Sequence, residues 1–419
     1  MNQQTGIAPG AVRALTLATA GFAINFWAWA LIAPLAPGLR DELNLTVVQQ
    51  AVLVALPVLV GSVGRIPVGA LTDRYGGRIM FPLVSIATAV PVLALTVADT
   101  YALLLVIGFV LGIGGTAFAI GMPLLAGWYP PARRGLAFGI YGAGMGGTAA
   151  ATFSTVPLAD AFGRNAPFLL VAAVLVGYAV LAWLLLRDGP ARRMGGSALQ
   201  ASKAAVRLPM TWFLSILYAV GFGGFVAFSV YLPAYLRIAY DLLDADAGAR
   251  TAGFVLVAII ARPLGGWLSD RYHPAHVLIA VFTGTALLAI VAAFTPPLIP
   301  VGTIAFLGMA AGLGAAAGGV FAFVGKLAPP DKVGSVTGIV GAAGGLGGFF
   351  PPLIMGSVYA IDGSYAIGLM LLSNVALAAA VFTWLRLSPT ALALRERDEP
   401  DPAAAADERS TDAASGTAR

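Results

Sequence analysis

The chain has 419 residues, of which 59% are hydrophobic and only 10% are charged, and it contains no cysteine. A mean hydropathy of +0.88 excludes a water-soluble globular protein of this length, and the lack of cysteine excludes disulfides and thiolate metal sites. The formal net charge of +5 takes its meaning from where the basic residues lie.

Long apolar segments follow one another along the chain. Each has about the 20 residues that a helix needs to cross the hydrocarbon layer, whereas membrane β-strands alternate in polarity and are about half as long. We expect twelve spanning helices, over residues 13–36, 47–71, 79–98, 101–127, 135–159, 166–187, 209–236, 250–268, 276–295, 299–325, 334–358 and 365–387. The sequence therefore predicts an all-α membrane protein. The first segment is too long for a secretory signal and lacks a cleavage site, so we expect it to remain as the first span.

Basic residues indicate the orientation of these spans. With a cytoplasmic N-terminus, all but six of the 24 Lys and Arg residues fall in cytoplasmic segments, as the positive-inside rule requires. The exceptions are Arg40, Arg164, Arg237 and Arg250, on the outer side, and Arg65 and Arg262, inside apolar segments. We expect both termini in the cytoplasm and the protein in the cell (plasma) membrane, with the lipid bilayer around it. The basic charge reflects this topology, and no basic domain with interleaved aromatic residues indicates a nucleic-acid partner.

An internal repeat relates the two halves of the chain. Residues 65–75, RIPVGALTDRY, recur as residues 262–272, RPLGGWLSDRY, and GIYGAG at 139–144 recurs as GIVGAA at 338–343. The chain is therefore expected to be a duplicated six-helix unit.

The repeat predicts the domain organisation. Two pseudo-symmetric six-helix bundles are expected over residues 1–187 and 209–387, joined by a polar, basic cytoplasmic linker at 188–208. Residues 388–419 are rich in Ala, Asp, Glu and Ser and have too little apolar surface to fold, so we expect a disordered cytoplasmic tail.

The two arginines inside apolar segments are expected near the middle of the membrane. Arg65 and Arg262 each precede the aspartate of the repeat by eight residues, a rise of about 12 Å in a core about 30 Å thick. All 19 acidic residues lie outside the apolar cores, so no protein carboxylate can pair with them there. An unpaired buried charge costs at least about 2.5 to 3.5 kcal/mol. The counter-ion must be water, carbonyl dipoles or a substrate.

A substrate anion is the favoured counter-ion. The planar fork of arginine suits a planar oxyanion better than a lysine ammonium would. The alternative is a structural role in which carbonyls and water satisfy the two guanidinium groups.

A charged motif stands at the end of the second and eighth spans. Its first copy reads G-x3-D-R-x-G-x-R and comprises Gly69, Asp73, Arg74, Gly76 and Arg78. The degenerate second copy comprises Gly266, Asp270 and Arg271. With the duplicated six-helix unit, this motif resembles the major facilitator superfamily over nearly the whole chain. The resemblance implies that superfamily's fold, with a substrate site at the midplane between two halves that rock to expose it alternately.

The same resemblance implies a cytoplasmic gate at this motif. Its residues would be Gly69, Asp73, Arg74, Arg78, Asp270 and Arg271. Topology alone would require the arginines, whereas Asp73 is expected to form an ion pair that stabilises one transport state. Capping of a helix is the alternative for Asp73.

Two glycine-rich runs, GIYGAGMGG at 139–147 and GIVGAAGGLGGFFPP at 338–352, resemble the signature segments of the nitrate/nitrite porter family, a branch of the superfamily. The resemblance implies that Arg65 and Arg262 bind the substrate anion. It also implies Tyr218 as a hydrogen-bond donor at the site, with Phe222 and Phe118 as its walls. The segment NFWAW offers further candidates, which are Asn25, Phe26 and Trp29.

The glycines of these runs allow backbones to approach closely. Those expected along the substrate pathway are Gly142, Gly144, Gly146, Gly341, Gly344 and Gly345, for which packing alone is the alternative. The chain departs from the family pattern at Gly147 and Ala258, where asparagines would be familiar. Without two amide donors, the choice among nitrate, nitrite and another small anion stays open.

Energy coupling is constrained by the absence of proton relays. No carboxylate is expected at depth, and His273 and His276 fall in a cytoplasmic loop, so nitrate/nitrite antiport is favoured over proton-coupled nitrate symport.

Other functional classes fit the sequence less well. A proton-coupled exporter of organic compounds would need a midplane carboxylate, and a non-transporting nutrient sensor is the alternative from a different class. No G-x-S-x-G, P-loop or H-E-x-x-H motif indicates an enzyme. We expect no cofactor, and a transporter that works as a monomer with nitrate and nitrite as its partners.

Overall fold

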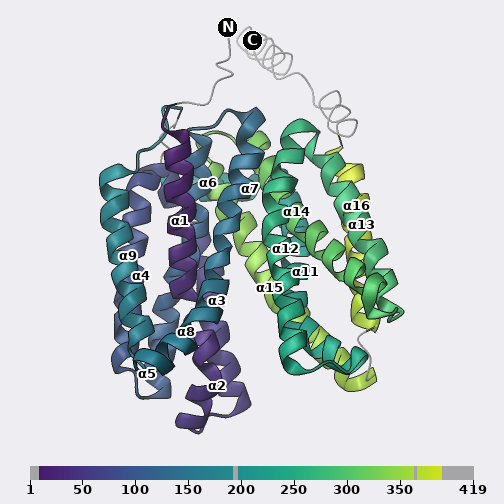
Figure 1. Ribbon diagram of the computed structural model, residues 1–419. Coiled ribbons are helices and arrows are strands. Elements are labelled where there is room, and N and C mark those ends of the chain that lie inside the picture. The colour runs from purple at the N-terminus through teal and green to yellow at the C-terminus, as the bar shows by residue number, and fades with distance from the viewer. Residues whose placement is uncertain (1–8, 192–196, 363–365, 389–419) are drawn as a thin grey trace, which may run out of the picture.

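The computed structural model describes residues 9–191, 197–362 and 366–388, and these ranges contain helices and no strands (Figure 1). The first bundle contains α1 (Ala11–Trp29), α2 (Ile32–Glu42), α3 (Val47–Tyr75), α4 (Gly77–Ala94), α5 (Tyr101–Leu111), α6 (Phe118–Ala126), α7 (Arg134–Gly142), α8 (Gly147–Phe162) and α9 (Ala166–Leu185). Helix α10 (Ala198–Arg207) leads to the second bundle, which contains α11 (Pro209–Tyr240), α12 (Asp244–Arg271), α13 (Pro274–Ala293), α14 (Thr303–Leu327), α15 (Val333–Asp362) and α16 (Ala366–Leu387). The prediction of an all-α membrane fold is confirmed for this part of the chain.

Ten helical runs within the described ranges are long and apolar enough to cross a membrane, and they correspond to ten of the twelve predicted spans. The predicted span 135–159 is divided between α7 and α8 by a short 3-10 segment, η4 (Ala143–Gly146). The predicted span 334–358 lies within α15, which has 30 residues. The count of twelve and the cytoplasmic termini therefore stay predictions.

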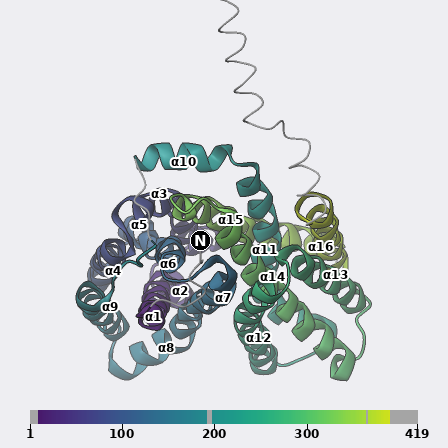
Figure 2. The same cartoon turned by 90° about the horizontal axis from the view of Figure 1, so that it is seen from above.

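More of the predicted linker than of the predicted tail lies within the described residues. Helix α10 lies within the predicted linker 188–208 and packs against α3 and α15, along the edge of the molecule in the view from above (Figure 2). The tail expected at 388–419 lies outside the described residues except for its first position.

The ends of α3 follow from its sequence. Thr46 caps the helix by accepting a hydrogen bond from the Gln49 N–H, and the Gln49 side chain accepts one from the Thr46 N–H, which forms a capping box. The helix stops at Gly76, whose φ of 88° is rarely adopted by residues with a side chain. The second glycine of the charged motif thus makes the sharp turn into α4.

The two bundles meet along two helix pairs, α3 with α15 and α7 with α12. In the view from above, α15 lies beside α3, while α7 faces α12 and α14 (Figure 2). Glycines bring these backbones into contact, because a Cβ at Gly69 would collide with the carbonyl of Gly334, and one at Gly266 with the carbonyl of Gly135. The two pairs are equivalent in the internal repeat, so the contact between bundles is itself pseudo-symmetric.

Candidate functional site

Arg65 on α3 and Arg262 on α12 are both buried, with 2% and 4% of their surface exposed. Nε of Arg65 donates to the Gly115 carbonyl at 3.2 Å, and Nη1 donates to the Gly341 carbonyl at 2.6 Å. Nη1 of Arg262 donates to the Gly142 carbonyl at 3.2 Å. Within the described residues neither guanidinium group forms an ion pair. Backbone carbonyls are thus hydrogen-bond partners of both guanidinium groups, and no carboxylate in the described part of the chain neutralises their charge.

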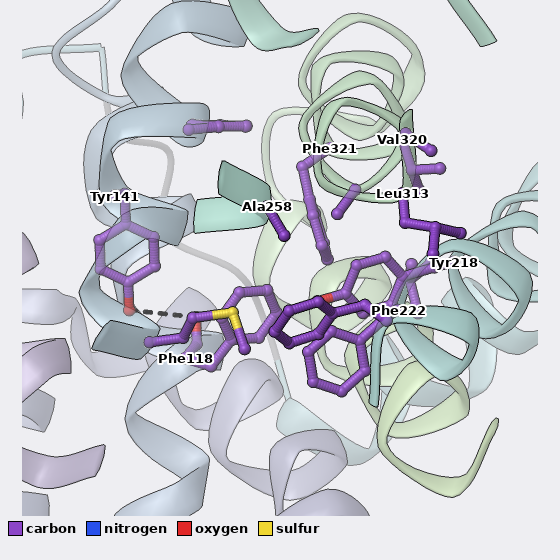
Figure 3. Packing of buried hydrophobic residues seen from close by; sticks show 14 of the residues in the cluster. Phe118, Tyr141, Tyr218, Phe222, Ala258, Leu313, Val320 and Phe321 are labelled. Carbon is purple, nitrogen blue, oxygen red and sulfur yellow. Dashed lines mark hydrogen bonds between the residues drawn. The ribbon is translucent and has the colours of Figure 1, made fainter. Parts of the chain in front are cut away.

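A row of aromatic rings connects the two arginines. The Arg65 Cζ atom lies 5.2 Å from the ring centre of Phe118, and the Arg262 Cζ atom lies 5.5 Å from that of Phe222. Between these rings Tyr218 stacks on both, with centre distances of 6.3 Å to Phe118 and 5.3 Å to Phe222 (Figure 3). Rings this close to a cation interact favourably with it, so the row forms an aromatic wall along which both guanidinium groups lie.

Tyr218 holds the central position in this wall. It is 1% exposed, and it lies close to both Arg65 and Arg262, whose like charges repel each other. The five residues that the sequence predicts to bind substrate therefore gather in one place. An anion between the guanidinium groups would neutralise charge and could accept from the phenol.

The candidates in the NFWAW segment differ in their placement. Phe26 faces the site, with its ring centre 5.9 Å from the Arg65 Cζ atom. Trp29 donates from Nε1 to the Pro57 carbonyl, and Asn25 donates from Nδ2 to the Gly21 carbonyl and the Ser85 hydroxyl, all within the first bundle. Of the three, Phe26 belongs to the arginine surroundings.

Three of the predicted pathway glycines border a guanidinium group. A Cβ on Gly142 would lie 3.6 Å from Arg262 Nη1, one on Gly341 would lie 3.2 Å from Arg65 Cδ, and one on Gly345 would lie 3.5 Å from Arg65 Nη1. These three positions keep side-chain volume away from the arginines.

Of the remaining pathway glycines, Gly344 and Gly144 serve packing and Gly146 does not. A Cβ on Gly344 would collide with the ring of Tyr218, and one on Gly144 would press on Phe22, whereas Gly146 has its nearest neighbour, Ile259, at 4.0 Å. Gly147 lies against the Ala23 carbonyl of α1. This close packing leaves no room for the asparagine that the family pattern suggests at Gly147.

Tyr141 supports the site, and the sequence-based prediction did not include it. Its hydroxyl donates to the Ala117 carbonyl at 2.7 Å and accepts from the Gly121 N–H at 3.3 Å. These bonds secure the backbone around Phe118, where the 3-10 segment η2 (Gly112–Ala117) changes into α6 (Figure 3). The signal for this residue was its place in GIYGAG, whose repeat GIVGAA has no hydroxyl at the same position.

We expect Tyr141→Phe to lower both thermal stability and apparent anion affinity. The substitution keeps the ring but leaves buried backbone groups without their partner, which costs about 1 to 3 kcal/mol. Tyr178→Phe is the matched control, because that hydroxyl donates to the Leu17 carbonyl inside the first bundle. Thermal unfolding in detergent and anion titration measure the two effects. Equal losses of affinity in both variants would contradict the role given to Tyr141.

The two gate aspartates cap helices of the opposite bundle. Asp73 accepts from the N–H groups of Gly334 and Ser335, each at 2.8 Å, and also from the Ser335 hydroxyl. Asp270 accepts from the N–H groups of Gly135 and Leu136, each at 2.8 Å. A carboxylate at a helix N-terminus is stabilised by the unpaired N–H groups and the helix dipole.

The cap is the alternative given for Asp73, and the ion pair in one transport state stays a prediction. The contacts of Asp73 in the described part of the chain are the cap on α15 and no cation, because the start of α15 offers three donors where an arginine would have to be desolvated. The expected bridge between helices is present, but it joins the two bundles through a cap.

The other gate residues lie around these caps. The N–H of Arg78 donates to Asp188 at 3.3 Å. Arg74 lies 5.2 Å from the ring centre of Tyr75, and Arg271 lies 6.0 Å from that of Trp267. Gly69 makes the backbone contact with α15 described above.

Arg134 is a third buried arginine, and the sequence-based prediction treated it only as a marker of topology. It is 8% exposed and donates to the carbonyls of Ala126, Tyr129 and Gly325 at 2.8, 3.0 and 2.7 Å. Gly325 belongs to α14, so Arg134 also links the two bundles at the gate. No pattern in the sequence set Arg134 apart from the other basic residues of the predicted cytoplasmic segments.

Comparisons with known proteins agree with this architecture. The model of the Major Facilitator Superfamily matches residues 18–352 and 241–413. The chain is 51% identical to the "Probable nitrate/nitrite transporter NarK2" of Mycobacterium tuberculosis over 88% of this chain and 95% of that protein. It is 40% identical to the "Nitrite extrusion protein" of Bacillus subtilis over 88% of this chain and 93% of that protein.

Solved structures show the same fold at low sequence identity. The human organic anion transporter MFSD10 superposes with a TM-score of 0.75 at 15% identity, over 90% of this chain and all of that one. The proton:xylose symporter XylE superposes with a TM-score of 0.73 at 15% identity, over 91% of this chain and 97% of that one.

Proposed function

The chain belongs to the nitrate/nitrite transporter family of the major facilitator superfamily, and from this premise we propose that Arg65 and Arg262 hold nitrate or nitrite between them during alternating access. The protein is a multi-pass membrane transporter and not an enzyme. Because both arginines belong to one chain, a monomer contains the complete proposed site.

The observation that carries the proposal is the pair of buried guanidinium groups from opposite bundles. Each keeps N–H groups beyond those given to carbonyls, since a guanidinium has five. A planar oxyanion can accept from both forks at once, and such charge-assisted bonds are about twice as strong as neutral ones. Glycines beside the forks keep side-chain volume away from the arginines, which suits a small anion better than a large organic one.

We propose antiport of nitrate against nitrite. The carboxylates nearest to the arginines along α3 and α12, Asp73 and Asp270, are engaged as helix caps. His273 lies in the turn between α12 and α13 and accepts from the Ala275 N–H, and burial lowers its pKa below the usual 6.5, so it is neutral at pH 7. Without a proton carrier beside the site, one anion is expected to leave only when another replaces it.

Counterflow in liposomes tests the function. Purified protein should exchange labelled external nitrate for internal nitrite, without acceleration by an imposed pH gradient. If a pH gradient drives nitrate uptake into anion-free liposomes, the protein is a proton-coupled symporter and not an antiporter. Failure to move either anion under both conditions would refute the proposed substrate.

A further inference from the structure

The hydrogen bonds of the two arginines are related by the internal repeat. Arg65 belongs to the first bundle and donates to the Gly341 carbonyl on α15 of the second. Arg262 belongs to the second bundle and donates to the Gly142 carbonyl at the end of α7 in the first. Gly142 in GIYGAG and Gly341 in GIVGAA occupy the same place in the repeat. Each arginine thus crosses to the equivalent glycine of the other half.

These bonds form the inner end of a continuous contact between the bundles. From the gate inward along α3 and α15, Asp73 caps Gly334, Gly69 meets the Gly334 carbonyl, and Gly338 lies against the Arg65 carbonyl. Along α12 and α7 the order repeats.

On the second helix pair, Asp270 caps Gly135, Gly266 meets the Gly135 carbonyl, and Gly139 lies against the Arg262 carbonyl. The hydrogen bonds to Gly341 and Gly142 follow one turn deeper. The arginine bonds and the gate caps thus lie along the same two helix pairs.

We propose that Gly142 and Gly341 are positioning residues whose carbonyls hold the two guanidinium groups until an anion takes their place. A neutral carbonyl is a weaker acceptor than an oxyanion, so a bound anion withdraws both N–H groups from the opposite backbone. The proposal rests on the proposed function, because it takes nitrate or nitrite as the competing acceptor.

The consequence is that anion binding releases the contact at its inner end. In the empty carrier, the arginine bonds fasten α3 to α15 and α7 to α12, and the gate stays closed. In the loaded carrier, both arginines turn to the anion, and the backbones are free to part. Opening of the closed gate then requires an anion, because only the anion releases these hydrogen bonds.

Charge repulsion alone predicts the opposite behaviour of arginine variants. If the two guanidinium groups only repelled each other across the site, removal of one would favour closure of the empty carrier. If they fasten the bundles, removal of one favours opening. The sign of the change in the empty carrier therefore separates the two mechanisms without any anion present.

Spin labels across the gate measure this sign. The chain has no cysteine, so Ala132→Cys and Leu327→Cys place two labels directly. Both residues are exposed, one on each bundle, and the bond between Arg134 and Gly325 brings their segments together. Distance distributions are recorded for Arg65→Met, Arg262→Met and the parent, each without anion and with nitrate.

The expected result is a roughly tenfold rise in the open-to-closed ratio of both empty variants, the effect of losing one hydrogen bond of a charged group. Nitrate should open the gate of the parent and leave the variants unchanged. Arg250→Met is the control, because Arg250 pairs with Asp246 on its own helix and should not alter the gate.

Empty variants as closed as the parent, or more closed, would overturn the proposal. If a variant does not fold, measurements on the parent alone test the proposal. Nitrate binding that calorimetry detects in the parent without a change in the distance between the labels would also overturn the proposal. Failure of the parent to bind or exchange nitrate refutes the proposed function instead. The test of the empty variants is independent of that outcome.

Discussion

Exchange of nitrate for nitrite is expected to fall below detection when Arg65 or Arg262 is replaced by lysine. Lysine keeps the charge but replaces a planar fork by a single point, and it cannot reach a carbonyl and an anion in the same geometry. Loss of one charge-assisted hydrogen bond of about 1.5 to 3 kcal/mol lowers affinity by about 10- to 160-fold. Counterflow in liposomes and anion titration in detergent measure the two quantities.

The matched control for this prediction lies on the same helix as Arg262. Arg250→Lys makes the same chemical change at a residue that is paired with Asp246 near the start of α12, and it should leave exchange intact. Normal exchange in both Arg65→Lys and Arg262→Lys would show that the arginines serve structure alone, and the assigned anion site would be wrong.

The two arginines of the site could be predicted because a charged side chain is unfavourable in the apolar interior of a membrane. A guanidinium group in an apolar segment without any carboxylate at depth required another partner, and the repeat of RIPVGALTDRY supplied a second such group at equal depth. The structure brings Arg65, Arg262, Tyr218, Phe222 and Phe118 together. Residue type, spacing and the internal repeat were enough to single out Arg65 and Arg262, whereas Tyr218, Phe222 and Phe118 were expected from the resemblance to the porter family.

The contacts that the sequence left open or did not predict are made with the backbone of another helix. The carbonyl partners of Arg65, the cap made by Asp73 and the three carbonyls around Arg134 involve groups that every residue carries. No pattern of side chains marks them. The division of the predicted span 135–159 into α7, η4 and α8 has the same origin, because glycines permit a 3-10 segment without requiring one.

The largest effect on the conformational cycle is expected from alanine at Gly69 or Gly266. Each glycine touches the opposite backbone in the closed gate, and a Cβ there would collide with the carbonyl of Gly334 or Gly135. Overpacking costs about 1 to 3 kcal/mol, and the cost falls only on the state in which the helices touch. The open-to-closed ratio should therefore rise by about 5- to 160-fold, and exchange should fall because every cycle passes through the closed gate.

Gly253→Ala provides the control on the same helix as Gly266. It has open space around its Cβ position, so it changes helix propensity in the same way without touching the other bundle. Labels at Ala132→Cys and Leu327→Cys report the gate in all three variants. Because Gly69 and Gly266 are equivalent in the repeat, their substitutions should shift the gate in the same direction and to a similar extent. A shift caused by only one of them would mean that one helix pair, and not both, sets the closed state.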